Sequence, residues 1–281
     1  MSRKSTLSRI RAGIAAAAIA AFALTGCAPA DTAATDESAI TTITPGKLTI
    51  GTGLPAYEPW VVGDAPESGE GFEAAVAYAI AAELGFAAED VVWVRTTFDE
   101  AIAPGAKNFD FNLQQYTITE ERKANVDFSD PYYTTTQTVI TVAGSAAENA
   151  ASLADLKELL VGAASATTSF TAIEEFITPT AGAQAFNSND DAKAALQSGQ
   201  LDALVVDLPT ALYLTCCDLT DGKILGQIAG AEGGDSFGLV LDKGSALTAA
   251  VNAAIKALRD SGKLAELEKK WLTDTSAPVL K

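Results

Sequence analysis

Residues 117 to 133 read TITEERKANVDFSDPYY, and this stretch constrains the fold and the function more than any other part of the chain. Thr119 is a favourable helix N-cap, and Glu120 and Glu121 suit the positive end of a helix dipole. Arg122 does not suit it, because a cation in the first turn faces unpaired N–H groups and loses about 0.3–1 kcal/mol against the dipole. Locally unfavourable residues of this kind are typical of functional sites.

Two interpretations of Arg122 fit this stretch. In one, the guanidinium fork and the free helix N–H groups form a site for an anion, shaped for a carboxylate. In the other, Arg122 pairs with Glu121 or Asp127 on a solvated face and has no part in binding.

The N-terminus has the pattern of a bacterial lipoprotein signal. Its basic residues are Arg3, Lys4, Arg9 and Arg11. The apolar run Ala12–Leu24 that follows is shorter than the about 20 residues that span a bilayer. Residues 24–27, LTGC, resemble a lipobox, which ends in a lipidated cysteine. We therefore expect residues 1–26 to be a signal peptide and Cys27 to anchor the protein on the extracytoplasmic face of the cell membrane. An ordinary cleaved signal is the alternative.

The remaining composition indicates an acidic body behind a tether. Residues 27–46 are rich in Ala and Thr and lack periodicity, so we expect a flexible tether and a folded part that begins near Lys47. Removing residues 1–26 takes away four of the 19 basic residues and none of the 36 acidic ones; 15 against 36 is a net charge of −21. This acidity argues against nucleic acid as a partner, and no later segment reaches transmembrane length.

The absence of histidine from the sequence excludes Ser-His-Asp and Cys-His catalysis and argues against a catalytic zinc site. Besides Cys27, the cysteines are the adjacent Cys216 and Cys217. An oxidising compartment favours a disulfide between them, and two free thiols are the alternative. We expect no cofactor and no metal.

Strand patterns alternate with helical ones from residue 47 to 272, which predicts an α/β fold of two lobes, each a mostly parallel sheet flanked by helices. We expect the chain to cross between the lobes near 138–142 and 237–241, with residues 47–138 and 242–281 in lobe 1 and residues 139–241 in lobe 2. The predicted strands are 47–51, 91–94, 111–113, 137–142, 160–164, 184–186, 203–207 and 236–241. The predicted helices are 73–84, 153–159, 168–176, 190–198, 209–214, 245–261 and 263–272.

Candidate binding residues follow several of these strands, where open α/β sheets bind their ligands. Arg122 offers a cation, Thr167 and Thr168 open a helix that favours an anion, and Asp207 ends an apolar strand. Tyr57, Trp60 and Phe98 offer aromatic faces on loops after strands. A carboxylate and an ammonium one carbon apart fit this set, which predicts an α-amino acid as ligand. Taken singly, each residue is equally well explained as a helix cap or as core.

These residues carry a resemblance to the extracytoplasmic substrate-binding proteins of amino-acid ABC transporters, the polar amino-acid family (family 3), over about 47–272. The matching segments are GT at 51–52 with Tyr57 and Trp60, GFE at 71–73, TITEER at 117–122, DFSDPYY at 127–133, VG at 161–162, TT at 167–168, LDALVVD at 201–207, and 262–271.

The resemblance implies a hinged type II periplasmic-binding-protein-like fold that closes on one amino acid and delivers it, as a monomer, to a membrane permease. It implies that Arg122, with Thr117, Thr167 and Thr168, holds the α-carboxylate. It also implies that Asp207 holds the α-ammonium, and that Tyr57, Phe98 and Trp60 cover the ligand, with Gln115 beside it.

The sequence departs from the family pattern where side-chain selectivity is set. Gly53 stands where many members carry Asp, which removes a contact for basic side chains. Gln114, Gln115 and Tyr116 replace small residues, and the two amides favour a neutral polar or amide-bearing ligand. Glu58 replaces a Pro and keeps a basic ligand open. Ala166 replaces the Gly usual before Thr167.

Two other functions remain compatible with the sequence. Periplasmic dehydratases share this fold, and their chemistry needs a general acid, for which Glu58 or Glu73 is the best candidate. A ligand-sensing protein would need a separate signalling partner, because only residues 272–281 follow Trp271.

Overall fold

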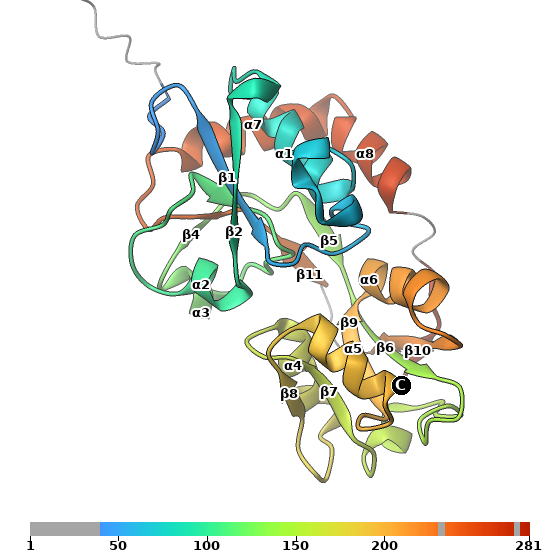
Figure 1. Cartoon of the computed structure of the whole chain (residues 1–281). Helices are drawn as coiled ribbons and strands as arrows, with labels where there is room; N and C mark the ends of the chain where they lie inside the picture. Colours follow the sequence, from blue (N-terminus) through green and yellow to red (C-terminus); the bar gives the residue numbers. More distant parts are fainter. Residues whose placement is uncertain (1–39, 230–233, 273–275) are drawn as a thin grey trace, which may run out of the picture. The chain divides into compact units, whose positions relative to one another are not determined.

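The computed structural model describes residues 40–229, 234–272 and 276–281 (Figure 1). The predicted signal peptide, the predicted lipidation site Cys27 and most of the predicted tether lie outside these residues. Residues Ile40–Lys281 form one compact unit. Among the helices of the described residues, none combines the length and the apolar character that a bilayer crossing requires.

The first lobe is built on a five-stranded sheet of order β2-β1-β3-β12-β4. Its strands are β1 (Leu48–Gly53), β2 (Val91–Thr96), β3 (Phe111–Asn112), β12 (Val240–Leu241) and β4 (Asp127–Phe128). Strand β1 pairs in parallel with β2 and β3, whereas β12 pairs antiparallel with β3 and β4. The sheet is therefore mixed, because the strand that returns late in the chain runs against its neighbours.

Helices cover both faces of this sheet. They are α1 (Phe72–Glu83), α7 (Thr248–Asp260), α8 (Lys263–Trp271), α2 (Phe98–Ile102) and α3 (Glu120–Lys123). Helices α1, α7 and α8 lie together in Figure 1 and pack apolar side chains such as Ile80, Ile255 and Leu267 onto one face. A smaller cluster around Tyr116 and Val240 forms the core of the other face.

The second lobe is built on a six-stranded mixed sheet of order β13-β10-β6-β9-β7-β8. Its strands are β6 (Gln137–Val142), β7 (Val161–Ala164), β8 (Gln184–Phe186), β9 (Ala203–Asp207), β10 (Gly222–Ile228) and β13 (Val279–Leu280). Its helices are α4 (Thr168–Ala172), α5 (Asn189–Gln197) and α6 (Leu208–Tyr213), with π-helical turns at Ile173–Ile177 and Leu214–Asp218 that extend α4 and α6. Two buried clusters, one on each face, hold the helices to the sheet.

Short 3-10 helices complete the chain, at Val62–Asp64, Pro66–Ser68, Ala88–Asp90 and Leu153–Leu156. The last of these replaces most of the predicted helix 153–159. The Cys216–Cys217 pair lies in the π-helical turn after α6 and is disulfide-bonded.

Two short antiparallel strands connect the lobes. Strand β5 (Tyr133–Thr135) pairs with β11 (Asp235–Phe237). Along the chain, β5 lies between β4 of the first sheet and β6 of the second, and β11 lies between β10 of the second sheet and β12 of the first. Both crossings lie earlier than predicted: β5 ends before the predicted crossing at 138–142 begins, and β11 overlaps the predicted crossing at 237–241 by one residue. Residues 137–142 already belong to the second sheet. The predicted strand 236–241 is divided between two strands, β11, which pairs with β5, and β12, which belongs to the first sheet.

The C-terminal residues also depart from the expected division, which assigned 242–281 to lobe 1. Strand β13 pairs in parallel with β10 and therefore belongs to the second sheet. Strand β10 was not predicted either. A strand of two residues has no periodicity to detect, and β10 contains Gly222 and Gly226, which weaken a strand pattern.

Candidate functional site

A cavity of about 110 Å³ lies at the strand ends of both lobes. Its polar and charged lining residues are Thr97, Gln114, Gln115, Arg122, Ser165, Thr167, Thr168, Ser169, Asn187, Ser188, Asn189 and Asp207. The other lining residues are Leu54, Pro55, Tyr57, Phe98, Ala164 and Val206. Of the described residues that line the cavity, the charged ones are Arg122 and Asp207, one from each lobe.

Arg122 is held at the cavity wall by contacts to both lobes. Its side chain is largely buried, with 8% of the residue exposed. Nη1 donates to the carbonyl oxygen of Thr117 (2.7 Å), and Nη2 donates to that of Ala166 in the second lobe (2.8 Å). The guanidinium carbon lies 5.2 Å from the centre of the Phe98 ring, a cation–π arrangement.

The solvated interpretation of Arg122 is therefore wrong. Asp127 instead forms an ion pair with Lys243 (3.0 Å). Thr119 caps α3 as predicted, because its hydroxyl accepts from the backbone N–H of Arg122 (3.2 Å). Within the described residues the Arg122 side chain donates to two carbonyl oxygens, which leaves others of its five N–H donors available to a ligand.

Asp207 ends β9 and faces the same cavity from the second lobe. Its Oδ1 accepts from Nε2 of Gln137 (3.2 Å). Burial raises the pKa of the Asp207 carboxyl well above its usual range, and the nearby negative charge of Asp235 raises it further. An approaching cation would favour the ionised form, so the carboxyl is suited to an ammonium group.

A hydrogen-bonded chain connects the neighbours of Arg122 and Asp207. The Thr117 and Thr168 hydroxyls lie 3.1 Å apart, and Thr168 donates to Oδ2 of Asp235 (2.7 Å). Gln137 donates to Asp235 and to Asp207. Asp235 lies on the crossing strand β11, so this network ties the crossing strands to the cavity wall. Sequence reasoning missed Asp235, because its hydrogen-bond partners Gln137 and Thr168 lie 98 and 67 residues away along the chain, and the neighbouring sequence shows no sign of them.

Two predicted ligand contacts are not at the cavity. Trp60 is fully buried in the core of the first lobe, and its Nε1 donates to Oγ1 of Thr210 in the second lobe (2.9 Å). Thr117 lies behind Arg122 rather than among the described lining residues. The Trp60 indole is large and buries more apolar area in a core than at a polar cavity wall. For Thr117, the neighbouring sequence does not reveal whether the side chain faces the ligand or the protein interior.

The other predicted residues line the cavity. Thr167 caps α4: its hydroxyl accepts from the backbone N–H of Phe170 (3.2 Å) and donates to the carbonyl of Ala164 (2.6 Å). Phe98 stacks on Tyr116 with ring centres 4.5 Å apart. Tyr57 is half-buried, and burial raises the pKa of its hydroxyl, with a further contribution from the Asp190 carboxylate.

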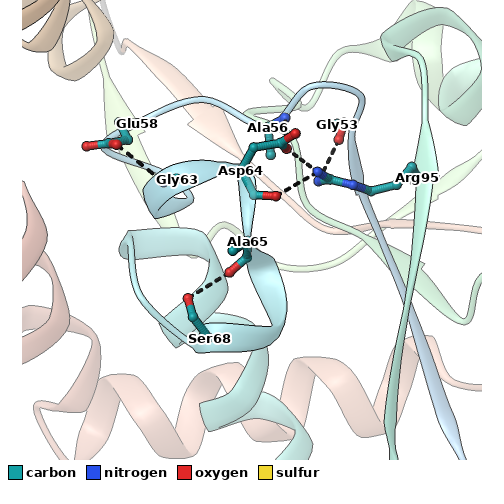
Figure 2. Close-up of polar contacts among 8 residues, drawn as sticks. All are labelled: Gly53, Ala56, Glu58, Gly63, Asp64, Ala65, Ser68 and Arg95. Atoms are coloured by element: carbon teal, nitrogen blue, oxygen red, sulfur yellow. Dashed lines mark hydrogen bonds and ion pairs between the residues drawn. The ribbon is translucent and has the colours of Figure 1, made fainter.

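Arg95 on β2 holds the loop that carries Tyr57 (Figure 2). Its guanidinium donates to the carbonyl oxygens of Gly53 (2.9 Å) and Asp64 (2.9 Å) and pairs with the Asp64 carboxylate. The same carboxylate accepts from the backbone N–H of Ala56 (2.8 Å). These contacts fix both ends of residues 53–64 against the edge strand of the sheet.

Gln115 is held by a buried carboxylate behind the cavity wall. Its backbone N–H donates to Oε1 of Glu73 (2.8 Å), and its side-chain Nε2 donates to Oε2. The Tyr132 hydroxyl also donates to Glu73, which is 1% exposed. Burial raises the pKa of the Glu73 carboxyl to about 7, against the lowering effect of these hydrogen bonds. The contacts stabilise Gln115 at a φ of 53°, in the left-handed region.

Sequence reasoning also missed Asn187, Ser188 and Asn189. They follow β8 (Gln184–Phe186) directly, so the strand-end rule that selected Thr167 and Asp207 applies to them as well. No group of three or more acidic or cysteine side chains suited to a metal ion was found in the described residues.

The two sheets, the paired crossing strands and the cavity between strand ends define a type II periplasmic-binding-protein fold. A family model matches residues 48–274, and the chain belongs to the bacterial extracellular solute-binding proteins, family 3.

Individual relatives agree with this assignment. The chain is similar to the ABC transporter glutamine-binding protein GlnH of Bacillus subtilis (strain 168), with 32% identity over 218 residues that cover 75% of this chain and 77% of that protein. Among solved structures it resembles an ancestral arginine-binding protein bound to glutamine, with a TM-score of 0.70, 31% identity, and coverage of 82% of this chain and 100% of that one. It also resembles the ancestral amino acid-binding protein AncCDT-1, a precursor of cyclohexadienyl dehydratase, with a TM-score of 0.66, 31% identity, and coverage of 81% and 96%.

Proposed function

We propose that this protein captures an α-amino acid outside the cytoplasmic membrane and delivers it to an ABC importer. The observation that carries the proposal is the placement of Arg122 and Asp207 on opposite lobes at one cavity. The guanidinium would hold the α-carboxylate and the Asp207 carboxylate the α-ammonium, with Phe98 and Tyr57 against the ligand. The names of the glutamine-binding and arginine-binding relatives support an amino acid as the ligand class.

Ligand analogues test the two ends of this clamp separately. The protein from residue 28, unfolded and refolded to remove any ligand, would be titrated by calorimetry with the twenty amino acids. The best ligand would then be compared with its amine, which lacks the α-carboxylate, and with its α-hydroxy acid, which lacks the ammonium. Arg122→Ala should cost about 2–5 kcal/mol for the amino acid and little for the amine. Equal losses for both would contradict the assignment of Arg122 to the carboxylate.

Closure would occur about the crossing strands. We infer that β5 and β11 form the hinge and that the lobes part on either side of them, because these two strands pair with each other where the chain passes between the sheets. The chain passes between the lobes once more, from α8 in the first lobe to β13 in the second sheet. Ligand binding should lower the radius of gyration measured by small-angle scattering. An unchanged radius at saturating ligand would argue against hinge closure.

Lipid attachment at Cys27 would keep the protein near its permease. This proposal rests on the sequence of residues 24–27. Cys27→Ser should move the protein from the membrane fraction to the soluble fraction, whereas Ala28→Ser should leave it in the membrane fraction.

A dehydratase function has less support. Neither of its two candidate acids is among the described lining residues: Glu73 lies behind Gln115, and Glu58 accepts from the backbone N–H of Gly63 (3.3 Å). We therefore propose a binding protein without enzymatic activity. Turnover of a hydroxylated cyclic carboxylic acid by the purified protein would contradict it.

A further inference from the structure

The amide of Gln115 has its orientation set by Glu73. An ionised carboxylate only accepts hydrogen bonds, so the NH₂ end of the Gln115 amide must face it, as observed. The backbone N–H of Gln115 and the Tyr132 hydroxyl add two further donors to the same carboxylate. Burial raises the pKa of Glu73 to about 7, so this orientation of the Gln115 amide holds at a pH above 7, where the carboxylate is ionised. Oε1 of Gln115 is then the end without a partner among the described residues, on a side chain that lines the cavity.

The amide of Gln114 has the opposite orientation. Its Oε1 accepts from the Tyr116 hydroxyl (2.9 Å), which is the shorter of the two contacts that this hydroxyl makes; the other is to the Phe98 carbonyl oxygen (3.2 Å). The NH₂ group of Gln114 therefore has no partner among the described residues, and Gln114 also lines the cavity. The two neighbouring glutamines thus leave one donor and one acceptor unpaired.

Gly53 makes room for this arrangement. A Cβ atom at position 53 would lie 3.0 Å from Nε2 of Gln114 and 2.8 Å from the carbonyl oxygen of Pro55. A side chain here would therefore displace the Gln114 amide. Glycine has no side chain, so position 53 adds no carboxylate, and the part of the cavity wall formed by Gln114 and Gln115 carries no formal charge.

We propose that Glu73 and Tyr116 are positioning residues that make this wall complementary to a terminal carboxamide, and that the preferred ligands are α-amino acids with a carboxamide side chain. The inference rests on the proposed function, because Arg122 and Asp207 must first hold the two α-groups. A carboxamide has one donor group, its NH₂, and one acceptor atom, its carbonyl oxygen, which match Oε1 of Gln115 and Nε2 of Gln114.

Other polar side chains on the ligand would place an acceptor against an acceptor, or a donor against a donor, at one of these two groups. A glutamate carboxylate would meet Oε1 of Gln115, so two acceptors would face each other. An ammonium or guanidinium group would meet the NH₂ of Gln114, so two donors would face each other. A polar group left unpaired in a closed site reduces affinity by roughly 10- to 100-fold, which sets the expected discrimination.

Glu73→Gln provides a specific test, because it should reverse the Gln115 amide. The new amide must use its oxygen to accept from the Gln115 backbone N–H, which can only donate, so its NH₂ would face the Gln115 side chain. Gln115 would then turn its Oε1 toward that NH₂ and present NH₂ to the cavity. Two donors would line the wall, and they complement a carboxylate.

The experiment is calorimetric titration of the wild-type protein with all twenty amino acids, and of each variant with L-glutamine, L-asparagine, L-glutamate and L-arginine, at a pH above 7 where Glu73 is ionised. We expect the wild-type protein to prefer a carboxamide ligand over L-glutamate by at least tenfold, and Glu73→Gln to lower this ratio by at least tenfold or to reverse it. Glu83→Gln, an exposed residue on the same helix α1, removes the same charge and should leave the ratio unchanged. Tyr116→Phe releases the Gln114 amide and should also lower the ratio. It serves as the second variant if Glu73→Gln does not fold, as judged by circular dichroism.

Each other outcome overturns a distinct claim. Tightest binding of a charged or apolar amino acid by the wild-type protein would refute the carboxamide class and leave the proposed function intact. An unchanged ratio in folded Glu73→Gln or Tyr116→Phe would refute the positioning role of that residue. Binding of none of the twenty amino acids would refute the proposed function itself.

Discussion

Asp207→Asn should weaken binding of the amino acid by an amount that depends on pH. The substitution keeps the shape of the side chain and removes its negative charge, and loss of a buried charge partner costs about 2–5 kcal/mol, or roughly 30- to 5,000-fold in affinity. Burial and the Asp235 charge raise the pKa of Asp207 in the free protein. An ammonium ligand lowers that pKa again, so the complex binds fewer protons than the free protein.

The sign of the effect follows from this difference in protons. Affinity of the wild-type protein should rise with pH until the free Asp207 carboxyl is ionised, and binding should release protons below that point. Calorimetric titrations at several pH values, each in two buffers of different ionisation enthalpy, measure both quantities. Asp207→Asn should lose the pH dependence, and its affinity should approach that of the wild-type protein at low pH. A wild-type affinity that is independent of pH, without proton release, would refute the reasoning.

Three further predictions concern stability and the loop of residues 53–64. Trp60→Phe leaves the buried Thr210 hydroxyl without its donor and opens space in the core, so unfolding should become easier by about 1–3 kcal/mol in a thermal or urea melt, with ligand affinity changed less. Arg95→Met releases the loop that carries Tyr57. We expect ligand affinity to fall by less than tenfold and stability by less than about 1 kcal/mol, because the ion pair between Arg95 and Asp64 is partly exposed. Arg95→Lys should recover only part of the lost affinity and stability. The folded pKa of Glu73, about 7, lies above the usual value of 4.5, so its contribution to stability is present below pH 4.5 and is lost as the pH rises from 4.5 to about 7. Glu73→Gln should remove this decline of about 3 kcal/mol from the pH profile of urea unfolding, and an identical profile would contradict the raised pKa.

The sequence predicted most elements of the fold, because strand and helix patterns are local. Strands β6, β8 and β9 have the predicted bounds. For β6 and β9 the reason is a short run rich in Val, Ile and Leu. The same local rules identified Thr119 as the cap of α3 and Asp207 as the end of β9. Arg122 was marked by a local conflict with the helix dipole, which needs no knowledge of the rest of the chain.

Only the tertiary structure decided which of these side chains meet. Trp60 contacts Thr210 across 150 residues, and Arg122 reaches Ala166 across 44, so neither contact leaves a mark in the nearby sequence. The orientation of the Gln115 amide depends on Glu73, 42 residues earlier. Hydrogen bonds act over about 3 Å of space whatever the separation along the chain. The residue types at the site could therefore be read from the sequence, whereas the partners that orient them required the fold.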